Sequence, residues 1–204
     1  MLPSVWMSLT SRVLRVGMKP VSDLNTTLEA ALCAGESTGK QAFRDFVRAL
    51  KAAVDAGEWI DAAQALKRAV GPDLDYSSVR SLARVRDQLL DHIDPPSRSV
   101  RLAVLGSFTT TQLVEVLELQ LFAAGIGCEI YESEFGVVRQ EILDPTSQLY
   151  EFDPGTVYLA TDWRDLAHAP PLEQGLADVK QRVTREIEEW SSLWEKLHRG
   201  SGAR

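Results

Sequence analysis

Residues 103–113 read AVLGSFTTTQL, and this stretch decides how the second half of the chain folds. A short apolar run ends at Gly106, three threonines follow, and apolar residues with helical spacing begin after them. The order strand, turn, helix is typical of α/β proteins, in which ligands lie beyond the carboxyl ends of the strands. A functional site is therefore expected at this turn.

The same order repeats downstream of the turn. Apolar runs predict three strands, over 100–106, 126–133 and 155–162. Helices are predicted over 109–125 and 135–143, followed by a structured loop over 144–154. Because crossovers between such strands are right-handed, the strands should form a parallel sheet. We therefore expect a partial three-layer α/β domain over residues 99–204.

A long amphipathic helix is predicted over 172–200, at the end of this domain. Its apolar residues recur at helical spacing, and we expect all of them to face inward: Val179, Val183, Ile187, Trp190, Leu193, Trp194 and Leu197. A sheet of three strands closed by one helix leaves an edge open. Open edges and apolar surface favour association, so a homo-oligomer is expected.

The first half of the chain has apolar residues at helical spacing. Residues 1–24 are predicted to be a disordered lead-in and 25–92 a helical segment, followed by a Pro/Ser linker. Within that segment, helices are predicted over 41–57 and 58–70, and a third begins after Asp75 or Ser77. Such short helices form a small bundle or one tetratricopeptide-like unit.

Composition excludes several classes of function. The 204 residues carry a net charge of −7, which argues against binding nucleic acid or an anionic membrane surface. No run approaches the roughly 20 apolar residues of a membrane span. Cys33 and Cys128 have no partner at metal-ligand spacing, so we expect reduced thiols, no metal site and a cytoplasmic protein.

The turn itself admits three interpretations. Ser107 is a weak candidate nucleophile, for which His168 is the histidine nearest the right end of the sheet. Alternatively, Thr109 or Thr110 caps the following helix. In the third interpretation, the N–H groups and hydroxyls of the turn bind a phosphate or carboxylate. The spacing of the residues does not separate these interpretations.

Four further residues are candidates for ligand contact. Asp144 and Ser147, in DPTSQLY, are expected to face the same crevice, although turn chemistry explains both residue types equally well. Trp163 and Arg164 follow the third strand, where ligand-contacting residues lie. Both residue types are also enriched at protein interfaces.

Three segments resemble the N-terminal region of FkbH-like proteins. They are the G-x-F-T-T-x-x-L turn from Gly106 to Leu113, the segment GIGCEIYE at 125–132, and LDPTSQLYEFDPGTVYLAT at 143–161. The third segment matches a family pattern, L-D-P-x-S-x-L-Y-x-F-x-P-x-x-V, that no general α/β rule produces. The resemblance covers roughly residues 40–204.

This resemblance implies a HAD-superfamily protein of polyketide-type biosynthesis. In that family a C-terminal domain takes a phosphorylated three-carbon acid and, with Mg²⁺, passes a glyceryl unit to an acyl carrier protein. The N-terminal region is similar in fold to SGNH hydrolases. The resemblance places the family's catalytic Asp motif downstream of residue 204, so we expect no counterpart of it in this sequence. DLNTTL at 23–28 lies on the wrong side of the domain and is more simply a helix N-cap.

The chain is therefore expected to be the N-terminal portion of such a protein, truncated before the HAD domain. It would act as a non-catalytic scaffold or docking module, with no cofactor of its own and with Mg²⁺ only in the absent domain. Two alternatives remain open: a stand-alone SGNH-like esterase that uses Ser107, and a protein-interaction module built on the helices at 41–90.

Overall fold

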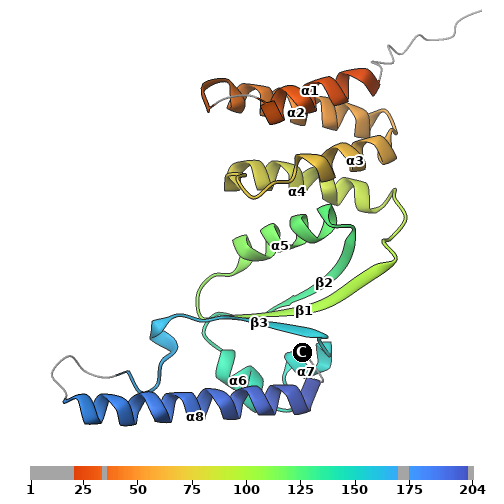
Figure 1. The fold of residues 1–204 in the computed structure, drawn as a ribbon. Helices are drawn as coiled ribbons and strands as arrows, with labels where there is room; N and C mark the ends of the chain where they lie inside the picture. Colours follow the sequence, from red (N-terminus) through yellow and green to blue (C-terminus); the bar gives the residue numbers. More distant parts are fainter. Residues whose placement is uncertain (1–20, 34–35, 170–174, 202–204) are drawn as a thin grey trace, which may run out of the picture.

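The computed structural model describes residues 21–33, 36–169 and 175–201 (Figure 1). Within these residues it has eight α-helices, the last of them long, and a three-stranded sheet. The parallel sheet, the helical first half and the long C-terminal helix agree with the α/β fold that the sequence predicts. The lead-in expected over 1–24 lies outside the described residues up to position 20. Residues 21–24, which the prediction included in the lead-in, lie in the first helix.

Four helices form the first half: α1 (Val21–Cys33), α2 (Glu36–Asp55), α3 (Trp59–Ala69) and α4 (Tyr76–Leu90). Their apolar faces share one core, in which Leu28, Phe46 and Leu82 are fully buried. Asp75 is the N-cap of α4, because its carboxylate accepts from the N–H of Ser78 at 2.8 Å. The N-cap interpretation of DLNTTL is wrong, because residues 23–28 lie inside α1.

The second half alternates strands and helices: β1 (Arg98–Gly106), α5 (Thr111–Ala123), β2 (Ile126–Glu132), α6 (Val138–Leu143), α7 (Gln148–Phe152), β3 (Thr156–Ala160), a 3₁₀ turn η1 (Trp163–Asp165) and α8 (Leu176–Ser201). The strand order is β2-β1-β3, with both pairings parallel. Central strand β1 aligns Val104 with Glu132 of β2 and with Tyr158 of β3. The sheet therefore has two edge strands, β2 and β3.

Helices cover both faces of this sheet (Figure 1). On one face lies α5, whose Leu119 and Phe122 also enter the core of the four-helix layer and so join the two halves of the chain. On the other face, Ala103 and Leu105 of β1 pack with apolar residues of α6, α7 and α8. Because successive side chains of a strand point to opposite faces, β1 contributes buried side chains to the helical layer on each face of the sheet.

Two sequence predictions are wrong in this half. The loop expected over 144–154 contains the short helix α7. On α8, the inward face is narrower than expected: Val183, Ile187 and Trp194 are exposed, while Leu193 and Leu197 are buried. The apolar arc of α8 is wider than its neighbour α6 can cover, since α8 is the outermost layer of the molecule (Figure 1). Every described helix is too short or too polar to cross a lipid bilayer.

Candidate functional site

The turn after β1 is shaped by close approach of its backbone to Thr110. A Cβ added to Gly106 would overlap Cγ2 of Thr110 and lie 2.9 Å from the carbonyl oxygen of Phe108. The loop after β2 binds the same glycine, because the N–H of Gly136 donates to the Gly106 carbonyl at 3.2 Å. Only glycine leaves room for this arrangement, so the G-S-F-T-T stretch determines the geometry at the carboxyl end of the sheet.

Thr110 occupies the N-cap position of α5 but makes no side-chain cap. Its buried hydroxyl donates instead to Glu132 at 2.7 Å, and the Thr111 hydroxyl donates to the same carboxylate oxygen at 3.0 Å. The expected side-chain cap is therefore wrong. The carboxylate of Glu132 lies at the start of α5, which is where the third interpretation of the turn places a phosphate or carboxylate ligand.

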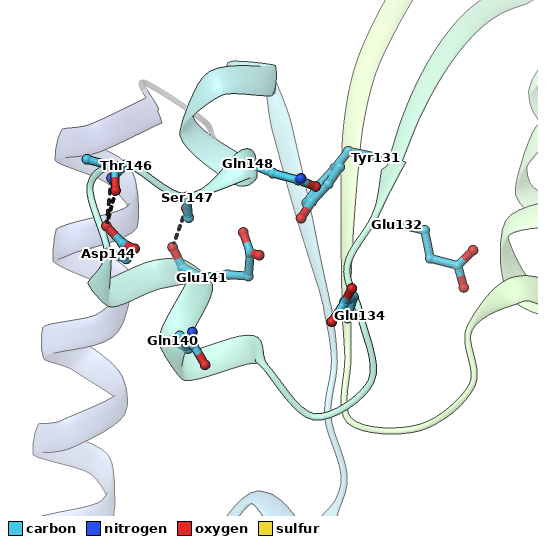
Figure 2. A pocket seen from close by; sticks show the side chains of 9 residues that line it. All are labelled: Tyr131, Glu132, Glu134, Gln140, Glu141, Asp144, Thr146, Ser147 and Gln148. Carbon is cyan, nitrogen blue, oxygen red and sulfur yellow. Dashed lines mark hydrogen bonds between the residues drawn. The ribbon is translucent and has the colours of Figure 1, made fainter.

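A pocket of about 290 Å³ opens beside this contact, at the carboxyl end of β2 (Figure 2). Its lining is polar and acidic: Tyr131, Glu132, Glu134, Gln140, Glu141, Asp144, Thr146, Ser147 and Gln148. Four of these nine residues are carboxylates and none is basic. Such a lining favours a cationic or hydroxyl-bearing group and disfavours a free anion.

Several pocket carboxylates also organise the backbone around them. Asp144 accepts from the N–H of Thr146 at 2.8 Å and from its hydroxyl at 2.7 Å, and these bonds hold the pKa of Asp144 below its ordinary value. Glu141 accepts from the N–H of Leu149 at 3.1 Å. Burial, with the charge of Glu141 adding to it, raises the pKa of Tyr131 to about 12, so this phenol stays protonated.

Ser107 points to the other side of the turn, towards β3. Both its N–H, at 3.2 Å, and its hydroxyl, at 3.4 Å, reach the carbonyl oxygen of Ala160. His168 is paired with Glu189 of α8 at 3.1 Å, and His92 stacks on Trp59 in the helical layer. The structure therefore gives Ser107 a backbone partner and engages both of these histidines elsewhere.

Trp163 and Arg164 form a small exposed unit in η1. The Arg164 guanidinium lies over the Trp163 ring, 5.1 Å from its centroid, and pairs with Asp162 at 2.7 Å. Trp163 is 70% exposed. Neither residue lines the acidic pocket.

One group in the described part of the chain has the composition of a metal site: His168, Glu186 and Glu189. Arg139 already contacts both carboxylates, since its guanidinium pairs with Glu189 and lies 3.4 Å from Glu186. The indole of Trp190 donates to Glu186 at 2.8 Å. The cluster therefore fits an ion-pair network that ties η1 and α6 to α8, and does not fit Mg²⁺, which requires oxygen ligands and retains its waters.

The structure thus brings together some of the predicted residues and separates others. Asp144 and Ser147 line the pocket, and Thr110 reaches it through Glu132. Ser107, Thr109, Trp163 and Arg164 are not in its lining, and Thr109 is simply exposed. Sequence reasoning missed Tyr131, Glu132 and Glu141. Of these three, only Glu132 could have been found from the sequence, because it is a charged residue at the carboxyl end of a predicted strand.

Comparison with known proteins gives little further information. No protein-family model and no curated protein matches the chain. One solved structure is similar, the N-terminal part of the protein BF1531 from Bacteroides fragilis, described as containing a phosphatase domain complexed with Mg. The match has 21% identity and a TM-score of 0.42, and it covers 52% of this chain and 27% of the other. The match thus spans about a quarter of that chain, and at such a score the likeness carries no conclusion about fold or function.

Proposed function

We propose that the chain is a non-catalytic scaffold and docking unit of an FkbH-like protein of polyketide-type biosynthesis. In this proposal it holds an acyl carrier protein next to a HAD domain, which loads the glyceryl unit. The chemistry, the phosphorylated three-carbon acid and the Mg²⁺ belong to that other domain.

The observation that carries the proposal is that the three segments of the family resemblance converge on the carboxyl end of β2, one contact on each face of that strand (Figure 2). Thr110, from the first segment, bonds Glu132, from the second. Tyr131, also from the second segment, lies against Glu141, which accepts from the N–H of Leu149 in the third. Residues that are 20 to 40 positions apart thus build one corner of the sheet. Their shared role in a single structural unit supports reading them as one family feature.

The side chains of this corner support a scaffold more than a catalyst. The hydroxyls of Thr110 and Thr111 donate hydrogen bonds to Glu132, and the hydroxyl of Ser107 donates to a backbone carbonyl. Nucleophilic catalysis requires a base in hydrogen-bonding contact with the hydroxyl, and neither His92 nor His168 is so placed. An acidic pocket is also a poor site for a phosphorylated acid.

A basic row on α2 is the face we assign to docking. Lys40, Arg44, Arg48 and Lys51 recur every three or four residues and are all exposed, in a chain whose net charge is −7. Positive side chains on one helix face attract an acidic partner surface and raise the rate of encounter. A carrier protein with an acidic surface is therefore the appropriate probe.

The test is a binding titration of the 204-residue chain with such a carrier protein by calorimetry, at low and high salt. The double variant Arg44→Glu/Lys51→Glu should weaken binding at least tenfold at low salt. A matched control, Arg80→Glu/Arg84→Glu, reverses two exposed charges on α4 and should weaken binding less. Adding the HAD domain of an FkbH-like protein should then increase glyceryl transfer to the carrier.

Two results would contradict the proposal. One is the absence of carrier binding by the wild-type chain at any salt concentration. The other is transfer or phosphate release by the chain alone, without the HAD domain, because a scaffold has no such activity.

A further inference from the structure

The outer helix α8 has two apolar faces, of which the structure covers one. Leu193 and Leu197 are buried against the sheet layer. A second set of large apolar side chains is exposed: Leu176 (72%), Val183 (47%), Ile187 (60%) and Trp194 (56%). We call these four residues the outer stripe.

The spacing of the outer stripe is that of a helix–helix seam. Its members are separated by seven, four and seven residues, so they lie on one line along α8, as the a and d positions of a coiled coil do. The spacing is also palindromic. Val183 and Ile187 lie two residues on either side of Arg185, and Leu176 and Trp194 lie nine residues on either side.

A palindromic seam is complementary to itself when two copies run antiparallel. We propose that α8 pairs antiparallel with α8 of a second copy of this chain, around a twofold axis near Arg185. Val183 then meets the partner's Ile187, and Leu176 meets the partner's Trp194, each pair occurring twice as an isologous interface requires. Helical spacing places Arg185 on the side of α8 away from the stripe, so the two arginines do not face each other.

Charge along α8 favours this direction over the parallel one. The first half of the helix carries Lys180, Arg182 and Arg185 against one acid, Asp178. From Glu186 to Trp194 the stripe segment carries three glutamates and no basic residue, but Glu186 and Glu189 pair with Arg139 of the same chain, which leaves Glu188 exposed. Within residues 176–194, antiparallel pairing places the basic first half along the half that carries Glu188, whereas parallel pairing places the basic residues of the two copies together. The helix dipoles also oppose each other only in the antiparallel arrangement.

The position of α8 leaves room for a second helix. Figure 1 shows α8 as the outermost layer, with α6 and α7 between it and the sheet. The outer stripe runs from residue 176 to residue 194, which gives a seam of about 27 Å, or about five helical turns.

The first test measures the mass of the 204-residue chain by light scattering over a range of concentrations. The wild type should be a dimer that dissociates on dilution. Ile187→Glu should be a monomer at every concentration. Ile60→Glu is the matched control, because Ile60 is 70% exposed on α3, far from the stripe, and it should dimerise as the wild type does. Circular dichroism must show the same helix content in all three proteins.

The second test determines direction by disulfide formation in a Cys33→Ser/Cys128→Ser background. A mixture of Val183→Cys and Ile187→Cys chains should cross-link faster than either chain alone. Faster cross-linking of each chain with itself would indicate parallel pairing and overturn the proposal. So would a wild-type monomer at high concentration, or an Ile187→Glu chain that still associates, which would place the contact at another surface such as the edge strand β3.

Discussion

The hydroxyl of Thr110 donates to the carboxylate of Glu132 across 2.7 Å, and this contact joins the start of α5 to the end of β2. Thr110 is 2% exposed, so its hydroxyl has no access to bulk water as an alternative partner. The contact thus ties the turn after β1 to the end of β2.

Removing Glu132 should therefore destabilise the protein. Glu132→Ala leaves a buried hydroxyl without its acceptor and should lower the free energy of unfolding by about 1–2 kcal/mol. Chemical denaturation measures the change. Glu134→Ala, at an exposed neighbouring position, should change stability by less than about 0.5 kcal/mol. Adding Thr110→Val to Glu132→Ala should cost less than the sum of the two single changes, and strict additivity would refute the coupling.

Gly106→Ala should be among the most damaging single-methyl additions to the sheet. Its Cβ would collide with Thr110 and crowd the Phe108 carbonyl, so unfolding free energy should fall by about 2 kcal/mol. Gly71→Ala is the control, because no atom lies within 4 Å of the added methyl group. Thr110→Ser removes the colliding Cγ2 and should recover part of the loss in Gly106→Ala. Equal stability of the two alanine variants would show that the turn is not tightly packed.

Ser107→Ala should leave ester hydrolysis unchanged at the background rate. The reason is that the Ser107 hydroxyl is directed to the Ala160 carbonyl and not to a base. Initial rates with a chromogenic short-chain ester, compared for wild type and variant, measure this. A wild-type rate well above the variant's would restore the esterase interpretation.

Glu186 should make stability depend on pH in the acid range. Burial raises its pKa, but hydrogen bonds from the His168 N–H and the Trp190 indole outweigh burial, and the net pKa lies below the ordinary 4.5. A lowered folded-state pKa gives stability that is present above the unfolded value and is lost as pH falls through the folded value.

The measurement is unfolding free energy from pH 7 down to about pH 3. Glu186→Gln should be less stable than wild type at neutral pH and should lose less stability below about pH 4.5. Glu188→Gln, exposed on the same helix, should follow the wild-type curve. Parallel curves for wild type and Glu186→Gln would disprove the assignment.

Local pattern was sufficient to predict the three strands and the longer helices between and after them. The apolar runs that became β1, β2 and β3, and the helical spacing around Phe46 and Leu82, are properties of short segments, and the order of strand and helix limits the topology to a parallel sheet. Asp75 as a cap also followed from local chemistry. The helix α7 was missed because DPTSQLYEF carries strong turn residues on both sides of one short helical turn.

Tertiary structure alone decided what the side chains contact. The carboxylate of Glu132 reaches Thr110 across 22 positions of sequence, so the polar groups of the turn bond the protein itself, which no local pattern predicts. On α8, periodicity determined that one broad arc is apolar. Which part of that arc is covered depended on where α6 and α7 lie, so Leu193 is buried and Ile187 is exposed although both fit the same helical period. The sequence by itself determines which helix and strand faces are apolar, and the packing of distant segments determines which of those faces are buried.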